Sequence, residues 1–152
     1  MAITKFKRVI AGHKRIGLDS MGFIYFLEDN PRFADLAEVV FESAENGHAT
    51  IVSSVLATIE ILTGYRKAKD IALEDELKQM LQDFPNIEIH DLDASLIDRV
   101  VDLRAKYNIK TPDAIHIATA IERKADIFLT NDSDLVKIKE IKIIYLGDYA
   151  EK

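Results

Sequence analysis

Short apolar runs of strand length alternate along this chain with longer segments of helical periodicity. Parallel strands need a crossover connection, usually a helix, so the alternation predicts parallel pairing with right-handed crossovers. The predicted fold class is therefore α/β, a three-layer α/β/α sandwich with a mainly parallel central sheet of four to five strands. The strand-like runs are Arg15–Asp19, Ala49–Val52, Ile87–His90, Ala125–Thr130 and Ile141–Tyr145.

Caps and turn residues mark the helical segments between these runs. Asn30-Pro31 is expected to start one helix, which Asn46-Gly47 ends, and Ser53 or Ser54 is expected to cap the next. The apolar run Phe23–Leu27 fits a helix or a strand by its pattern alone. Further helices are predicted from about Asp70 to Asp83, from Asp93 through Leu103, and from the start of TPDAIHIATA at residues 111–120.

Length and composition bound the class of protein. With 152 residues, 48% hydrophobic and 30% charged, the chain is expected to form one domain over residues 1–152, with residues 1–14 as an N-terminal extension. The absence of cysteine excludes disulfides, a thiolate nucleophile and cysteine zinc sites. The sequence shows no signal peptide and no apolar run long enough to span a bilayer, so a cytoplasmic protein without a membrane partner is expected.

The net charge of −6 argues against nucleic-acid binding through bulk electrostatic attraction. Basic residues are nevertheless grouped, which is compatible with a positive rim around an acidic centre. The groups lie at residues 5–15, 66–69, 123–124 and 137–142. Solvated helix faces often carry such groups, so they indicate little about function by themselves.

Four acidic residues are predicted to lie at one edge of the sheet, where ligands of open α/β sheets bind. Asp19 ends the first predicted strand, and Asp132 lies just past the fourth. Asp113 lies in the first turn of the helix before the fourth strand, and Glu60 lies in the helix that follows the second. Because helix starts and strand ends share one rim, these acids can converge despite their separation in sequence.

Each acid also has an ordinary structural explanation. A carboxylate at Asp113 suits the helix dipole, with Thr111 as the expected N-cap. Asp19 can cap a helix, and Asp132 can cap a short helix or fix a turn. Glu60 can simply face solvent. Four acids assignable to one rim favour a shared function over four unrelated ones.

Carboxylates crowded at one rim raise one another's pKa unless a positive group lies among them. A hard divalent cation such as Mg²⁺ or Mn²⁺ takes oxygen ligands and keeps several waters, so it is the natural partner. Such an ion can activate a water for attack on phosphorus and neutralise charge on the departing oxygen. The acids therefore indicate metal-dependent phosphoryl chemistry, with Mg²⁺ or Mn²⁺ as the expected cofactor.

Four motifs carry a resemblance to a known family. In chain order they are LDSMGFIYFLEDNP from Leu18, SSVLATIEIL from Ser53, TPDAIHIATA from Thr111 and LTNDSDL from Leu129. Together they resemble the PIN-domain nucleases, and in particular the VapC-like ribonuclease toxins of toxin–antitoxin pairs. The resemblance covers the chain from about Arg15 to Tyr145, and it implies a PIN-like fold.

The resemblance also implies roles for individual residues. Asp19, Asp113 and Asp132 would be metal ligands, direct or through water. Glu60 would be a ligand or would orient a metal-bound water. The supporting residues would be the hydroxyls of Ser20 and Thr130, Asn131 in the same turn as Asp132, and Asp134 as an auxiliary acid. The implied reaction is hydrolysis of an RNA phosphodiester by a metal-activated water, leaving a 5′-phosphate and a 3′-hydroxyl.

The toxin resemblance further implies partners. A small antitoxin would cover the acidic pocket by placing a basic side chain among the carboxylates. A homodimer is also expected. Helices around residues 33–41 and 71–81 offer apolar faces for such contacts, although burial in the protein's own core explains most of those residues.

Some features depart from the family pattern. Met21 stands two residues after the first acid, where many members have Asn or Ser. Residues 1–14 precede the first strand and are compatible with a basic arm for RNA, an extra strand or an accessory segment. His116, one turn after Asp113, is interpreted as a packed or hydrogen-bonded histidine rather than a general base.

Other classes of protein fit less well. A haloacid-dehalogenase-like phosphatase needs a second aspartate where Met21 stands, and a receiver domain needs an acidic pair that is absent. A PIN-like module that binds RNA or protein without cutting is the main alternative. Such modules usually lose an acid, and all four positions are filled here, which favours an active ribonuclease.

Overall fold

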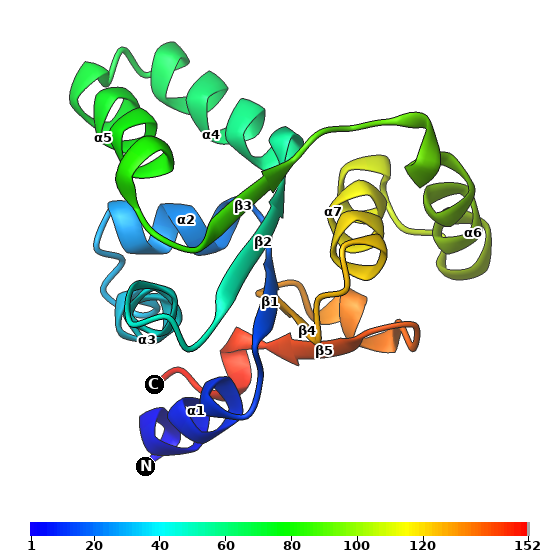
Figure 1. The fold of residues 1–152 in the computed structure, drawn as a ribbon, viewed down its shortest axis with the longest axis horizontal. Coiled ribbons are helices and arrows are strands. Elements are labelled where there is room, and N and C mark those ends of the chain that lie inside the picture. Colours follow the sequence, from blue (N-terminus) through cyan, green and yellow to red (C-terminus); the bar gives the residue numbers. More distant parts are fainter. Residues whose placement is uncertain (152) are drawn as a thin grey trace.

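The computed structural model describes residues 1–151, which form a five-stranded parallel sheet between two layers of helices (Figure 1). The strand order is β3-β2-β1-β4-β5, and every neighbouring pair is parallel. The carboxyl ends of all these strands therefore share one edge. The strands are β1 (Arg15–Leu18), β2 (Thr50–Ser54), β3 (Ile87–His90), β4 (Ile127–Thr130) and β5 (Lys142–Tyr145). The predicted three-layer α/β sandwich is confirmed.

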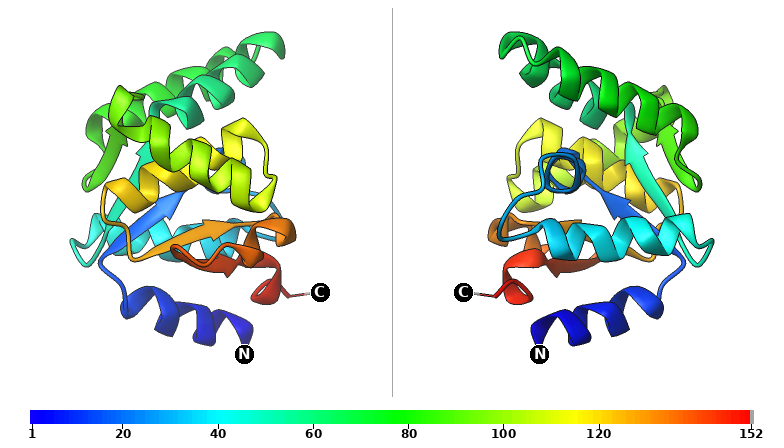
Figure 2. Two further views of the ribbon diagram at one scale, coloured as in Figure 1. Left: turned by 90° about the vertical axis from the view of Figure 1, so that its right-hand side faces the viewer. Right: turned by 90° about the vertical axis from the view of Figure 1, so that its left-hand side faces the viewer.

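Helices cover both faces of the sheet. In Figure 1, α2 (Ser20–Leu27) and α3 (Ala34–Glu45) lie to the left of the strands, and α6 (Ile97–Tyr107) and α7 (Thr111–Glu122) lie to the right. The pair α4 (Val55–Lys67) and α5 (Ile71–Asp83) projects at the top (Figures 1 and 2). Short 3₁₀ helices are η1 (Ala94–Leu96), η2 (Ser133–Lys137) and η3 (Leu146–Asp148). Among residues 1–151, no helix is long and apolar enough to cross a membrane.

The buried strands supply residues to a separate core on each face. Ile127 and Leu129 of β4 pack into the core beside α2 and α3, whereas Phe128 packs into the core beside α6 and α7. Gly17 of β1 lies where α7 approaches most closely. A Cβ at Gly17 would lie 2.8 Å from the Cβ of Ala120 and 2.9 Å from Cδ2 of Phe128, so only glycine fits there. This contact fixes α7 against β1, and thereby the start of α7 near the end of β1.

Some predicted helix boundaries were wrong. Asn30 does not start α3; its Oδ1 accepts hydrogen bonds from the backbone N–H groups of Arg32 and Phe33, which closes a local turn before the helix begins at Ala34. Thr111 is not the N-cap of α7. It is the first helical residue, Lys110 is the N-cap, and no side chain caps this end. The ambiguous run 23–27 is part of helix α2.

The N-terminal extension forms helix α1 (Ala2–Ala11), so the predicted alternative of an extra strand was wrong. Its apolar side is buried through Phe6 and Ile10, and it packs against α3. The ring of Phe6 also contacts Tyr149 near the other end of the chain, with a centroid distance of 5.3 Å. The helix therefore ties the two ends of the chain to the body of the domain.

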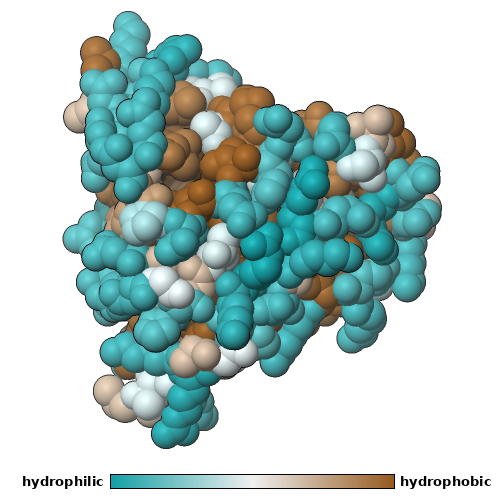
Figure 3. Space-filling model, in the orientation of Figure 1, coloured by the Kyte–Doolittle hydropathy of each residue, from teal (hydrophilic) through white to brown (hydrophobic). Residues whose placement is uncertain are grey.

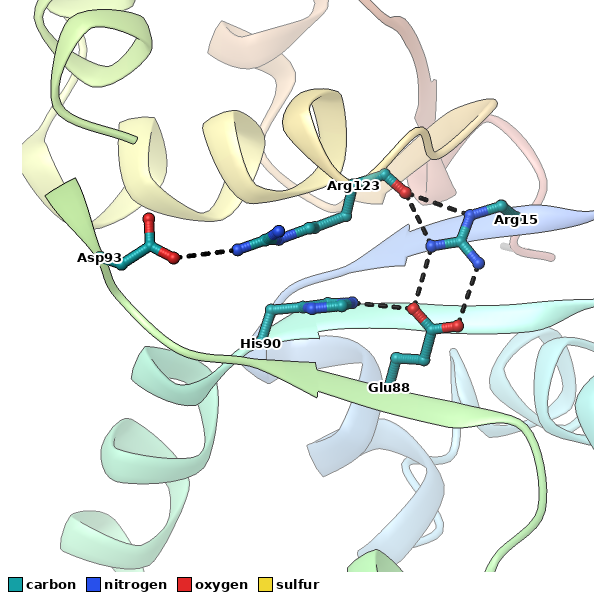
Figure 4. A network of polar contacts seen from close by, with 5 residues as sticks. All are labelled: Arg15, Glu88, His90, Asp93 and Arg123. Atoms are coloured by element: carbon teal, nitrogen blue, oxygen red, sulfur yellow. Dashed lines mark hydrogen bonds and ion pairs between the residues drawn. The ribbon is translucent and has the colours of Figure 1, made fainter. Parts of the chain in front are cut away.

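A polar network connects the end of α7 to β3, the strand at one edge of the sheet (Figure 4). Arg15 of β1 reaches across β2 and binds both carboxylate oxygens of Glu88 on β3, each at 3.0 Å. Its Nη2 and Nε also donate to the carbonyl oxygen of Arg123, at 2.7 and 3.1 Å. His90 adds a further contact to Glu88 at 2.8 Å. The Arg15 guanidinium therefore holds the pKa of Glu88 below its usual range.

We expect Arg15→Lys to lower the free energy of unfolding by about 1 kcal/mol, because an ammonium group cannot bind both Glu88 oxygens and the Arg123 carbonyl at once. Both charged side chains are partly exposed, which keeps the loss small. Urea unfolding at neutral pH measures it, with the exposed neighbour Lys14→Arg as the control. Equal stability of Arg15→Lys and the wild type would show that the bidentate geometry contributes nothing.

Candidate active site

Asp19 lies directly after β1 and caps α2. Its Oδ1 accepts hydrogen bonds from the backbone N–H groups of Met21 and Gly22, at 3.1 and 3.4 Å. Burial raises the pKa of Asp19 to about 6, and the nearby charge of Asp113 adds to the increase. The charge of His116 and the two backbone hydrogen bonds act in the opposite direction. Asp19 is therefore a carboxylate that is costly to ionise while no cation is bound.

Asp113 lies in the first turn of α7 and is partly buried. Burial raises its pKa, and the charges of Asp132 and Glu60 raise it further. Because the charge of Asp113 also acts on Asp19, each of the three other acids lies within electrostatic range of Asp113. The four predicted acids thus lie at the same edge of the sheet, near enough for the charge of Asp113 to interact with each of the others.

Asp132 follows β4 in a turn that its neighbours fix. Its backbone N–H donates to Oγ1 of Thr130 at 3.1 Å, and its own Oδ1 accepts from the backbone N–H of Asp134 at 2.9 Å. Asn131 donates through Nδ2 to Oη of Tyr25 at 2.9 Å, which joins this turn to α2. Thr130 and Asn131 therefore support the turn that carries Asp132, whereas the Asp134 side chain is exposed on η2.

Glu60 extends from α4, two turns past the end of β2. Its side chain is 36% exposed, and its Oε1 lies 2.7 Å from Nε2 of His116 on α7. The interpretation of His116 as a hydrogen-bonded, packed histidine agrees with this contact, since its side chain is only 5% exposed. Glu60 is therefore tied to the same helix that carries Asp113.

In three of the four acids, one carboxylate oxygen makes hydrogen bonds to other groups of the protein. Asp19 and Asp132 accept backbone hydrogen bonds through Oδ1, and Glu60 bonds to His116 through Oε1. Within residues 1–151, the second oxygen of each makes no hydrogen bond to protein. Capping and ligand binding are thus compatible uses of one carboxylate, and the structural explanations considered for Asp19 and Asp132 do not exclude a chemical role.

The donor set fits a hard divalent cation, because the groups at this rim are carboxylates, and burial together with neighbouring negative charge raises the pKa of Asp113 and Asp19. Across the part of the chain that the structure describes, no three acidic or histidine side chains stand close enough together to form a finished metal site. The acids share a rim without meeting at one point.

Two further groups lie near the candidate acids: Ser53, which was expected only as a possible helix cap, and Lys110. Ser53, buried in β2, donates its hydroxyl to the carbonyl oxygen of Leu18 at 2.9 Å and so fixes the end of β1 next to Asp19. Lys110, just before α7, places a positive charge near Asp113. The spacing of Lys110 and Asp113 in KTPD was the available signal. For Ser53 the sequence gives none, since its partner is a backbone carbonyl. The predicted supporting residue Ser20 makes no side-chain hydrogen bond within the described range.

Ligands of open α/β sheets bind outside the carboxyl ends of the strands, and carboxylates at that edge can hold a metal ion that activates a water for attack on a phosphate ester. The model of the PIN domain family matches residues 16–141 of the sequence. The chain therefore belongs to the PIN domain family, a family of nucleases that generally use divalent metal ions. No match was found among curated proteins.

Solved structures share this fold. A chain of VapBC2 from Rickettsia felis, bound to a DNA fragment from their promoter, superimposes with a TM-score of 0.70 at 20% identity, covering 86% of this chain and 98% of that one. A chain of a toxin–antitoxin complex from Klebsiella pneumoniae gives a TM-score of 0.66 at 20% identity, covering 88% of this chain and 98% of that one. At this identity the likeness shows the fold.

Proposed function

We propose that this protein is a metal-dependent endoribonuclease that hydrolyses RNA phosphodiester bonds with Mg²⁺ or Mn²⁺. The observation that carries the proposal is that Asp19, Glu60 and Asp132 all lie within electrostatic range of Asp113, at the edge of the sheet where α/β enzymes bind ligands. Membership of a nuclease family supports the reaction class. RNA as the substrate and Mg²⁺ or Mn²⁺ as the ion belong to the proposal.

In this proposal, Asp19, Asp113 and Asp132 hold the cation, and Glu60 holds it or orients a water. A bound Mg²⁺ or Mn²⁺ would supply activation of a water and neutralisation of charge on the departing oxygen. The chain's part is to keep the carboxylates in place. The N-cap bonds fix Asp19, and the Thr130 hydroxyl fixes the turn of Asp132.

The proposal includes a biological role as the toxin of a type II toxin–antitoxin pair, acting in the cytoplasm. Its support is that the chain shares its fold with structures described as toxin–antitoxin complexes. The proposed partners are a small antitoxin, which places a basic side chain among the carboxylates, and a second copy of the chain in a homodimer.

Exposed apolar surface near the acids supports a protein partner. A groove along α4 is lined by Ile59, Leu62 and Thr63, with Arg66 and Lys67 at its far end, and Ile59 is 52% exposed. Figure 3 shows apolar side chains gathered over α4. By contrast, the apolar face expected on α3 is buried in the protein's own core. Because Thr63 lies one turn after Glu60 on α4, a partner seated in this groove would border the acidic rim.

The decisive test is cleavage of a mixed cellular RNA pool by the purified protein with Mn²⁺, with Mg²⁺ or with a chelator. We expect discrete products with 5′-phosphate and 3′-hydroxyl ends that form only when metal is present. End-specific ligation followed by sequencing identifies both the ends and the cut site. Products with 2′,3′-cyclic phosphate ends, or products that form in the chelator, would contradict a metal-dependent hydrolysis.

The rival hypothesis, a PIN-like module that binds without cutting, predicts a different pattern. Such a module would leave the RNA pool intact with every metal. Calorimetric titration with Mn²⁺ then shows whether the acids bind a cation at all. The absence of both RNA cleavage and saturable metal binding would overturn the proposed function.

A further inference from the structure

A buried histidine joins the two helices that carry Glu60 and Asp113. His116 lies one turn after Asp113 on α7, so both side chains lie on the same side of that helix. Its Nε2 lies 2.7 Å from Oε1 of Glu60 on α4, and its charge acts on both Asp19 and Asp113. The imidazole therefore lies close to the acids. Within residues 1–151, its bond to Glu60 is the only hydrogen bond between α4 and α7.

The ring makes one directional contact, and that contact is with Glu60. An ionised carboxylate only accepts hydrogen bonds, so Nε2 must carry the hydrogen. Nδ1 is buried and has no hydrogen-bond partner in the described part of the chain. The one hydrogen bond of the His116 ring is therefore made with Glu60, an acid of the candidate site.

Glu60 needs such a contact more than the other acids do. Asp19 and Asp132 have short side chains held by backbone N–H groups at helix starts. Glu60 lies within α4, where the backbone N–H groups are already used by the helix, and its longer side chain is partly exposed. Without a partner, this carboxylate would sample several rotamers and turn toward solvent.

We infer that His116 is a positioning residue, which holds Oε1 of Glu60 so that its second oxygen faces the Asp113 side of the site. The inference rests on the proposed function and adds a residue to it. His116 itself touches neither RNA nor metal in this scheme. Its contribution is to remove the orientational freedom of Glu60 before the ligand arrives.

The test compares His116→Leu with His116→Gln, because the glutamine amide can donate a hydrogen bond from nearly the place of Nε2 and leucine cannot. Mn²⁺ affinity is measured by electron paramagnetic resonance titration, and RNA cleavage is measured in parallel. Loss of a partner that orients a metal ligand typically costs 10–100-fold. We expect His116→Leu to weaken Mn²⁺ binding by about 10-fold or more, and His116→Gln to restore most of the loss.

A second pair of variants separates positioning from a general effect on folding. In a Glu60→Gln background the carboxylate is already gone, so His116→Leu is expected to change Mn²⁺ affinity by less than about twofold. Thr119→Val is the matched control, since Thr119 is also buried on α7 but donates only to the Ile115 carbonyl. Its Mn²⁺ affinity should equal that of the wild type, and melting temperatures confirm that each variant folds.

The outcomes distinguish the inference from the proposed function. If the wild type binds Mn²⁺ and cleaves RNA, but His116→Leu does both equally well, the positioning role is wrong and the proposed function stands. If His116→Leu loses the same affinity with and without the Glu60 carboxylate, the residue acts on the fold, which also overturns the inference. If the wild type shows no saturable Mn²⁺ binding, the proposed function fails and the inference fails with it.

Discussion

Asp113→Asn is expected to lower metal-dependent RNA cleavage by about 10³-fold or more while the domain stays folded. Asparagine is nearly the same size as aspartate but is a weak ligand for Mg²⁺ or Mn²⁺, and the charge of Asp113 interacts with that of each of the other three acids. Since loss of residues that merely support metal ligands costs 10–100-fold, loss of a ligand carboxylate should cost more. Cleavage rates at saturating Mn²⁺ measure the effect.

The matched control is Asp98→Asn, which also removes a carboxylate from the first turn of a helix but lies on α6, outside the acidic rim. Asp98→Asn and Asp113→Asn remove the same charge from the start of a helix, so a difference between them measures the effect of lying at the acidic rim. We expect cleavage by Asp98→Asn to equal that of the wild type. Unchanged turnover in Asp113→Asn would remove this residue from the mechanism and would leave its carboxylate only the dipole role.

The layered architecture was predictable because it depends on local patterns. Short apolar runs bounded by turn residues can be read directly as buried parallel strands. Helix boundaries were less accurate where a side chain satisfied the backbone locally, as Asn30 does before α3. The start of α7 was misplaced for the opposite reason, since Thr111 makes no capping bond although its residue type favours one. Residue preferences give the probability of a cap, and the surrounding structure decides it.

The candidate acids could be selected from sequence because topology places strand ends and helix starts at one rim. Two features of the site were beyond such reasoning. The first is that Asp19 and Asp132 cap helices with one oxygen and leave the other unbonded, so two explanations that seemed to compete are both satisfied. The second is the contact between Glu60 and His116, because the two residues are 56 positions apart and only the packing of α4 on α7 brings them together.

The electrostatics of the rim imply that its ionised carboxylates destabilise the folded protein when no metal is bound. Burial and a neighbouring carboxylate raise the pKa values of Asp19 and Asp113, so ionising them at neutral pH disfavours the folded state. A cation that binds these oxygens would relieve that cost, and its binding would be linked to folding. Removing an acid should therefore stabilise the metal-free protein while it abolishes activity. Stability and function are expected to change in opposite directions at this rim.

The clearest case is Asp19→Asn, which is expected to stabilise the metal-free protein at pH 7 by up to about 3 kcal/mol. The pKa of Asp19 rises from 3.8 to about 6 on folding, and each pKa unit corresponds to about 1.4 kcal/mol. Asparagine is an equally good N-cap, so the helix start is preserved. Because the folded pKa is the higher one, the cost is absent below about pH 4, grows as pH rises toward 6, and is fully present above it.

Urea unfolding in a chelator at several pH values from 4 to 7 measures this difference. The advantage of Asp19→Asn over the wild type should vanish at the acidic end and reach its maximum near neutrality. Asp126→Asn is the control of opposite sign, because backbone N–H groups of Lys14 and Arg15 hold the pKa of Asp126 below its usual range. That substitution should destabilise the protein at neutral pH. If Asp19→Asn also destabilised it there, the carboxylate would be favourably placed without metal, and an electrostatic demand for a cation at this rim would be disproved.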